Sequence, residues 1–80
     1  MIQITVHYAA VLREAVGCSF EVIETEHSVL AHIFDEIKAR HNLGIKANQI
    51  VFAINNEFCP PQTNVKPNDE ILLMPPASGG

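Results

Sequence analysis

The stretch that decides the fold is the last one, Glu70-Ile71-Leu72-Leu73-Met74-Pro75-Pro76-Ala77-Ser78-Gly79-Gly80. The hydrophobic run 71–74 predicts a core strand with apolar side chains on both faces. Strand pairing should stop at Pro75, because proline has no amide hydrogen to donate, and a Pro-Pro pair favours the extended polyproline II form. We therefore predict a folded body over residues 1–74 and a tail over residues 75–80 that points away from it.

The glycines Gly79 and Gly80 suit a chemistry in which the terminal carboxylate is the reacting group. Residues without side chains can thread a narrow cleft and adopt almost any backbone conformation. The alternative interpretation is that small, polar chain ends are often frayed and have no function. The core strand and the two prolines directly upstream favour the first interpretation, so we predict that the C-terminus is the functional group.

Length and composition indicate one small globular domain of 80 residues, with 48% hydrophobic and 18% charged residues. The net charge of −4 argues against a nucleic-acid partner, because phosphates need a basic surface. No apolar run is long enough to span a membrane, and the N-terminus lacks a signal-peptide pattern. We expect a cytoplasmic protein in which Cys18 and Cys59 stay reduced.

The first half of the chain predicts two strands separated by a short helix. Residues 1–8 alternate, with Tyr8 on the same face as the apolar positions before it, which predicts a half-buried strand. Residues 9–16 change to helical spacing, and Gly17 is a natural stop. A second strand follows over residues 19–23, with Phe20 and Val22 on one face.

The main helix is predicted after Ser28, a suitable N-cap residue, and should close at Leu43-Gly44. Glu36 and Arg40 form a supportive pair four residues apart on its polar side. Its core-facing stripe comprises Val29, Leu30, Ile33, Phe34 and Ile37.

The second half of the chain predicts three strands. Residues 50–54 form the first, and Asn55-Asn56 makes a turn because Asn tolerates positive φ. Glu57-Phe58 begins a short return strand. The sequence of residues 66–69 is again turn chemistry, and it leads into the last strand, 70–74.

This element order predicts an α+β fold, a mixed sheet of about four to five strands with one main helix on one face. The first and last strands are the most hydrophobic, so we place them side by side at the sheet centre, as the parallel pair of a ubiquitin-like β-grasp. One helix covers only one face, so the other should carry an apolar patch beside the tail. Alternatively, residues 9–16 and the segment after Phe58 cover that face. Phe58, Met74 and Tyr8 are the candidate exposed anchors for a partner.

The sequence lacks the patterns of a stand-alone catalyst. Its four histidines show no metal-ligand spacing, and neither cysteine lies in a C-x-x-C motif. No glycine-rich phosphate loop, nucleophile elbow or pair of catalytic carboxylates stands out. We expect a substrate or carrier protein that binds no metal or cofactor of its own.

The run from Asn68 to Gly80 resembles the C-terminal signature of the MoaD-type sulfur carriers, the small-subunit family of molybdopterin synthase. That signature is Gly-Asp-Glu, a hydrophobic strand, Pro-Pro, a small residue or Val, then Ser or Thr, and finally Gly-Gly. The resemblance extends over the whole chain, including residues 12–17 and 53–55. Two departures are mild: Asn68 replaces the usual Gly, and Met74 stands where an aromatic residue is common.

The resemblance implies a sulfur-transfer cycle. An E1-like activating enzyme would use ATP to adenylate the carboxylate of Gly80, and a persulfide sulfur would replace AMP to leave a thiocarboxylate. The carrier would then insert its tail into the large synthase subunit and give its sulfur to cyclic pyranopterin monophosphate. Gly79 and Gly80 would carry the chemistry. The residues that would guide the tail are Pro75, Pro76, Ala77 and Ser78. The residues that would contact the partner are Met74, Phe58 and Tyr8.

Three alternatives remain at this point. A thiamine-pathway sulfur carrier has the same fold and Gly-Gly end but is usually shorter and lacks the Pro-Pro step. A ubiquitin-like modifier would join the activated Gly80 to lysines. A plain β-grasp binding module would use the sheet face and ignore the tail, so it would keep its function without Gly79-Gly80.

Overall fold

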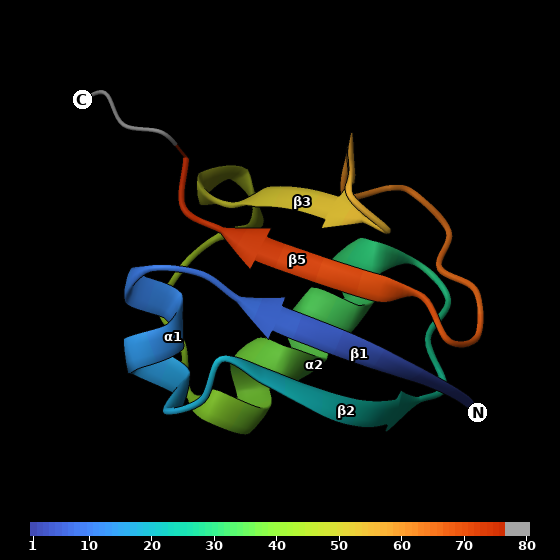
Figure 1. Cartoon of the computed structure of the whole chain (residues 1–80), viewed down its shortest axis with the longest axis horizontal. Coiled ribbons are helices and arrows are strands. Elements are labelled where there is room, and N and C mark those ends of the chain that lie inside the picture. Colours follow the sequence, from blue (N-terminus) through green and yellow to red (C-terminus); the bar gives the residue numbers. More distant parts are fainter. Residues whose placement is uncertain (77–80) are drawn as a thin grey trace.

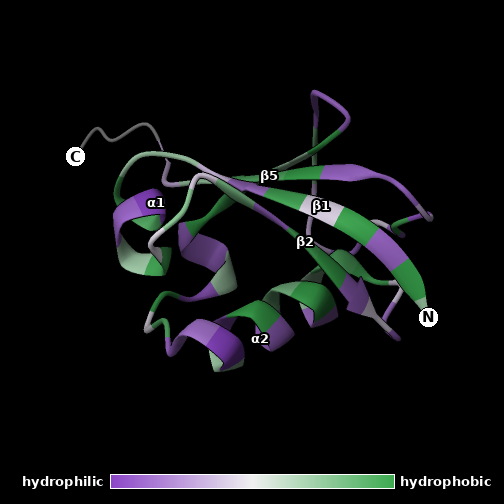
Figure 2. Cartoon of the chain, turned by 60° about the horizontal axis from the view of Figure 1, so that its bottom comes forward, coloured by the Kyte–Doolittle hydropathy of each residue, from purple (hydrophilic) through white to green (hydrophobic). Residues whose placement is uncertain are grey.

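A computed structural model describes residues 1–76 of the chain. In this part the chain forms one five-stranded sheet (Figure 1), and its two α-helices lie on the same side of the sheet (Figure 2). The elements are β1 (Ile2–Tyr8), α1 (Val11–Val16), β2 (Phe20–Thr25), α2 (Leu30–His41), the 3-10 turn η1 (Ala47–Gln49), β3 (Val51–Ile54), β4 (Glu57–Cys59) and β5 (Glu70–Met74). The strands lie in the order β2-β1-β5-β3-β4. The predicted α+β, ubiquitin-like β-grasp fold is confirmed, whereas the boundary at residue 74 between body and tail stays a prediction.

The centre of the sheet is the parallel pair of β1 and β5, as the hydrophobicity of the two strands predicts. Val6 lies opposite Ile71 in this pair, and both side chains are at most 1% exposed. Strands β2 and β3 pair antiparallel with the outer sides of β1 and β5. The last core strand is therefore held on both sides up to the point where the chain leaves the sheet.

Helix α2 covers the core face of the sheet through four residues of its predicted stripe. Each of these side chains is at most 1% exposed: Leu30, Ile33, Phe34 and Ile37. The ring of Phe34 meets Phe52 of β3 edge-on, with centroids 5.4 Å apart. Burial of these four side chains supplies the hydrophobic stabilisation that an isolated 12-residue helix would lack.

Both ends of α2 differ from the prediction. The N-cap residue is Val29, and Ser28 makes no side-chain cap. The reason is tertiary: the first helical amides, those of Leu30 and Ala31, donate to carbonyls of the segment 61–63 instead. The helix ends before Leu43-Gly44, because Asn42 adopts the left-handed conformation (φ 57°) that closes it.

The predicted turns have the expected backbone. Asn55, Asn56 and Asn68 all have positive φ, as does Gly17 at the end of α1. Asn68 thus adopts the left-handed conformation without the strain that a β-branched residue would have there. Ala10, between β1 and α1, is a further residue with positive φ and was not predicted.

The sheet face opposite α2, which we call the outer face, has no helix on it among the described residues (Figure 2). Helix α1 lies on the same side as α2, and its Leu12 is buried in the main core. The segment after β4 also turns to the α2 side, where Val65 is buried and its amide donates to the carbonyl of Ser28. The alternative that these two segments cover the outer face is therefore wrong.

Candidate functional site

The chain leaves the sheet beside α1, at the end of β5 (Figure 1). The amide of Ala9 donates to the carbonyl of Leu73 over 3.1 Å, and Met74 lies opposite Val51 in the last pair of the sheet. Pairing ends before Pro75, as predicted, since β5 stops at Met74. The sequence-predicted site residues Ala77, Ser78, Gly79 and Gly80 lie outside the described residues, so their roles stay predictions.

The strand register places one row of side chains across all five strands of the outer face. Phe20 lies opposite His7, His7 opposite Leu72, Leu72 opposite Ala53, and Ala53 opposite Phe58. The side chains at the two ends of this row are exposed to solvent: Phe20 is 55% and Phe58 is 74% exposed. The small side chain of Ala53 lies between two larger neighbours and is buried there, apart from the main core.

Further apolar residues flank the row on both sides. Val51 and Met74, both half-buried, lie on the side where the chain leaves the sheet, and the exposed Val22 lies on the opposite side. We call the whole set the apolar patch; it comprises Phe20, Val22, Val51, Phe58, Leu72 and Met74. A surface of this kind, directly beside the tail exit, is typical of a protein-binding site.

The three predicted anchor residues differ in exposure. Phe58 is exposed on the apolar patch, as predicted, and Met74 belongs to the patch but is half-buried. Tyr8 is only 3% exposed, so the prediction that it is an exposed anchor is wrong. The alternation of β1 puts Tyr8 on the same face as Ile4 and Val6, which is the core face.

The hydroxyl of Tyr8 belongs to a polar cluster that closes the core between β2 and α2. It donates to Oε2 of Glu21 over 2.5 Å, and Nε2 of His41 lies 2.6 Å from the same oxygen. Arg40 Nη1 lies 4.0 Å from the other carboxylate oxygen. Burial, and then the hydrogen bond to Glu21 and its negative charge, raise the pKa of Tyr8, so its phenol stays neutral.

The carboxylate of Glu21 is the charged centre of this cluster. Burial alone would raise its pKa, but the hydrogen bonds from Tyr8 and His41 and the charges of His41 and Arg40 together outweigh burial and lower it. Glu21 therefore stays ionised and joins β2 to the last turn of α2. We assign this cluster a structural role, because it lies on the core side of the sheet.

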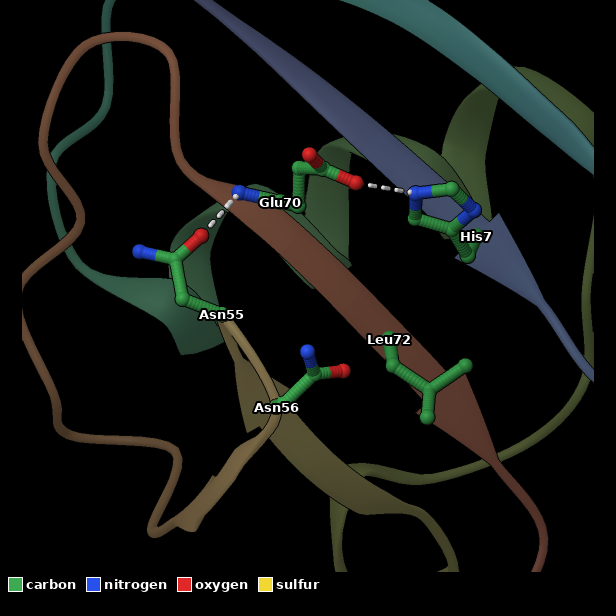
Figure 3. A pocket seen from close by; sticks show the side chains of 5 residues that line it. All are labelled: His7, Asn55, Asn56, Glu70 and Leu72. Carbon is green, nitrogen blue, oxygen red and sulfur yellow. Dashed lines mark hydrogen bonds and ion pairs between the residues drawn. The ribbon is translucent and has the colours of Figure 1, made fainter.

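A hollow of about 540 Å³ opens on the outer face beside the apolar patch (Figure 3). It is lined by His7, Asn55, Asn56, Glu70 and Leu72. Glu70 lies between two of these residues: its Oε1 is 2.9 Å from His7 Nε2, and its amide donates to Asn55 Oδ1 over 2.9 Å. This hollow was not predicted from the sequence. The Asn-Asn turn was its only signal, because His7 and Glu70 meet only through the register of β1 with β5.

Within residues 1–76, no three side chains of His, Cys, Asp or Glu lie close enough together to hold a metal ion. Cys18 and Cys59 are free and half-buried. No helix in the same range is long and apolar enough to cross a membrane. The two features of this part of the chain that suit a function are therefore the tail exit and the outer face.

Comparison with known proteins identifies the family. The model of the ThiS family matches residues 6–80, which is nearly the whole chain. The chain belongs to the ThiS family. Its relatives within this family include the molybdopterin synthase sulfur carrier subunit of Homo sapiens, 35% identical over 98% of this chain and 94% of the relative. The protein of the same name from Chlamydomonas reinhardtii is 38% identical over 98% of this chain and 99% of the relative. The resemblance to the MoaD-type sulfur carriers is thereby confirmed.

Among solved structures, this ThiS-family chain is similar to the small archaeal modifier protein 1 of H. volcanii. The TM-score is 0.83 over 96% of this chain and 100% of the other, with 17% sequence identity. At this identity the likeness shows the fold alone. Since a protein named as a modifier has the same fold, the fold does not distinguish a sulfur carrier from a protein modifier.

Proposed function

We propose that this chain is the sulfur-carrying small subunit of a molybdopterin synthase. The observation that carries the proposal is the similarity to two proteins named as molybdopterin synthase sulfur carrier subunits, which are 35% and 38% identical to this chain over 98% of its length. The large synthase subunit and an E1-like activating enzyme are the partners that this role requires. The chain itself would bind no cofactor, and the activating enzyme would use the ATP.

The proposed chemistry takes place at the carboxylate of Gly80. The carboxylate attacks the α-phosphate of ATP and pyrophosphate leaves, which converts a poor electrophile into an acyl adenylate. A persulfide then attacks the acyl carbon, and AMP departs with one former carboxylate oxygen. A thiol of the activating machinery cleaves the S–S bond and becomes a disulfide, so that the thiocarboxylate remains on Gly80. Its sulfur is the nucleophile that reacts with cyclic pyranopterin monophosphate.

The fold would serve this chemistry by positioning. The tail begins at Pro75, directly after a strand that is paired on both sides, so the body fixes where the tail starts. The apolar patch lies beside this point and would bind the large subunit, with Phe58 and Met74 among its contacts. Docking by the body then delivers the thiocarboxylate to the partner's active site at high effective concentration.

Reconstitution tests the proposal. The purified chain is incubated with the activating enzyme, ATP and a sulfur donor, and then with the large subunit of the same organism and cyclic pyranopterin monophosphate. We expect molybdopterin to form with the intact chain and none to form with a chain that lacks Gly79-Gly80. The truncated chain should still bind the large subunit and inhibit the intact one. Formation of molybdopterin by the truncated chain would contradict the proposal.

The same preparations distinguish the alternatives. A ubiquitin-like modifier would give covalent adducts with other proteins, visible as slower bands on a blot for this chain. A binding module would keep its partner after loss of Gly79-Gly80 and show no sulfur-dependent activity. A thiamine-pathway carrier would accept sulfur on Gly80 but give none to the large subunit of molybdopterin synthase.

A further inference from the structure

The hollow on the outer face presents polar groups that the chain itself leaves unused. Glu70 binds His7 through Oε1, and no hydrogen bond or ion pair within residues 1–76 uses its Oε2. Its side chain is 64% exposed and thus accessible from outside. The side-chain amide of Asn56 is likewise without a partner in this range, and it points across the hollow toward Leu72 (Figure 3). The hollow therefore offers a charged acceptor, an amide and an apolar side chain.

The frame that holds these groups is fixed by hydrogen bonds. Asn55 accepts from the amide of Glu70 through Oδ1, and its Nδ2 donates to Oδ1 of Asp69 over 2.9 Å. The other oxygen of Asp69 accepts the amide of Lys66 over 2.8 Å. The charge of Asp69 is thus used to hold the turn before β5, whereas that of Glu70 faces the hollow. His7 is held from the other side by the ring of Phe20, with centroids 5.9 Å apart.

We propose that this hollow receives the guanidinium group of an arginine from the large subunit that docks on the outer face. Glu70 Oε2 and the amide oxygen of Asn56 would accept from the planar guanidinium, and its aliphatic stem would lie along Leu72. Arginine suits the site better than lysine because it offers several donors in one plane and an apolar stem. This inference rests on the proposed function and names a specific contact of the same docking surface.

The charges of the hollow and of the whole chain favour a basic occupant. The hollow contains a carboxylate, and the whole chain carries a net charge of −4. The hollow is also continuous with the apolar patch, since Leu72 belongs to both. A partner that docks over Leu72 also reaches Glu70, which lies two residues away on the same face of β5. The carboxylate oxygen that His7 does not use would then lose its water, and this loss costs affinity unless a donor replaces the water. An opposing guanidinium removes this cost and fixes the orientation of the two proteins.

The experiment measures the binding of the large subunit of the same organism by calorimetry at low and high salt. Glu70→Gln removes the charge and keeps the shape of the side chain. Asn56→Gly removes the amide, and glycine accepts the left-handed backbone of Asn56 (φ 72°). Glu26→Gln is the matched control, because it changes the net charge by the same amount at an exposed position between β2 and α2.

We expect Glu70→Gln to weaken binding about tenfold and Asn56→Gly about threefold, by the usual strengths of charged and neutral hydrogen bonds. Glu26→Gln should bind like the wild type. The loss in Glu70→Gln should shrink at high salt. Melting temperatures close to that of the wild type would show that the variants are folded, since an exposed pair such as that of Glu70 with His7 adds little stability. Equal affinity of Glu70→Gln and wild type would overturn the inference and leave the proposed function intact.

A second measurement separates the two proposals if the wild-type chain does not bind the large subunit. In that case the proposed function fails, and the hollow is tested alone with N-acetyl-arginine methylamide and its lysine analogue as probes, followed by NMR of the labelled chain. Saturable shifts of the Asn56 side-chain amide with the arginine probe, weaker with lysine and lost in Glu70→Gln, would support an arginine site. Equal effects of both probes, or none, would overturn it.

Discussion

At the scale of single residues, the backbone of Ala10 is the feature that most clearly departs from local preference. Its φ of 54° and ψ of −129° place it in a region that L-residues rarely adopt and that glycine adopts freely. The chain needs this conformation to turn from β1 into α1 within two residues, Ala9 and Ala10. The fold therefore stores strain here and offsets it with the burial of Leu12 just beyond the turn.

Replacing Ala10 with glycine should relieve this strain. We expect Ala10→Gly to raise the free energy of unfolding by about 1 kcal/mol, the usual cost of a residue held in such a region. Urea unfolding of the two proteins, with equal slopes, measures the difference. Ala10→Val is the opposite control and should be destabilised. A glycine variant less stable than the wild type would show that the turn is not strained.

Gly80 is the residue on which the proposed chemistry depends. Among residues 1–76, the buried core runs from Ile4 to Leu73. Because the proposed role of Gly80 is chemical, we expect Gly80→Ala to leave the melting temperature unchanged. The methyl group would hinder attack at the adjacent carboxylate, and sulfur loading by the activating enzyme should fall at least severalfold. Calorimetry and the mass of the loaded product report the two effects separately. A large drop in melting temperature would contradict a purely chemical role for this residue.

At the scale of elements, the cluster around Glu21 connects β2 to α2 through hydrogen bonds and ion pairs. Glu21 takes part from β2, and Arg40 and His41 from the end of the helix, while Tyr8 closes the cluster from β1. Glu36 extends it: its Oε1 accepts from Thr25 over 2.6 Å, and its Oε2 lies 3.8 Å from Arg40. The cluster thus holds the last turn of α2 against the edge strand β2.

The lowered pKa of Glu21 fixes the sign of a pH effect. A carboxyl group whose pKa is lower in the folded state stabilises the protein above its ordinary value, here 4.5, and this contribution is lost as the pH falls below it. Glu21→Gln should therefore be less stable than the wild type by about 1 kcal/mol at pH 6, and the difference should shrink at pH 3. Thermal unfolding at both pH values measures it. A difference that stays constant between them would exclude Glu21 as the titrating group.

The elements were largely predictable because each depends on local chemistry. Alternation predicts β1, the stripe from Leu30 to Ile37 predicts α2, and the left-handed Asn residues predict the turns. The predictions fail where contacts with segments distant in the sequence determine the local structure. Ser28 is a good cap by type, but the amides of α2 are bonded by the segment 61–63, which no local pattern indicates. Tyr8 was predicted as an exposed anchor although its own alternation with Val6 places it in the core.

At the scale of the whole molecule, the two faces of the sheet have different roles. Its core face packs on α2 and α1 and supplies the stability, whereas its outer face and the exit of β5 remain accessible. The existence of an apolar outer face could be predicted by counting helices, since one main helix covers one face. The hollow could not, because His7 and Glu70 are 63 residues apart and only the register of β1 with β5 brings them together.

The apolar patch gives a prediction for the assembly. Met74→Arg places a charge on the patch beside the tail exit, where a docked partner would exclude water. We expect binding to the large subunit to weaken at least tenfold, which corresponds to about 1.4 kcal/mol, while the chain stays folded because Met74 is only half-buried. Val11→Arg is a suitable control, because Val11 is 56% exposed on α1 and outside the patch. Unchanged affinity of Met74→Arg would remove this residue from the docking surface.

The proposal that Gly80 carries sulfur can be tested by the intact mass of the chain purified from its own host without a C-terminal tag. We expect a fraction of molecules heavier by one sulfur-for-oxygen exchange, located by fragmentation in the C-terminal peptide that contains Gly80. If only the free carboxylate is found, even after incubation with the activating enzyme, ATP and a sulfur donor, the sulfur-carrier account is contradicted.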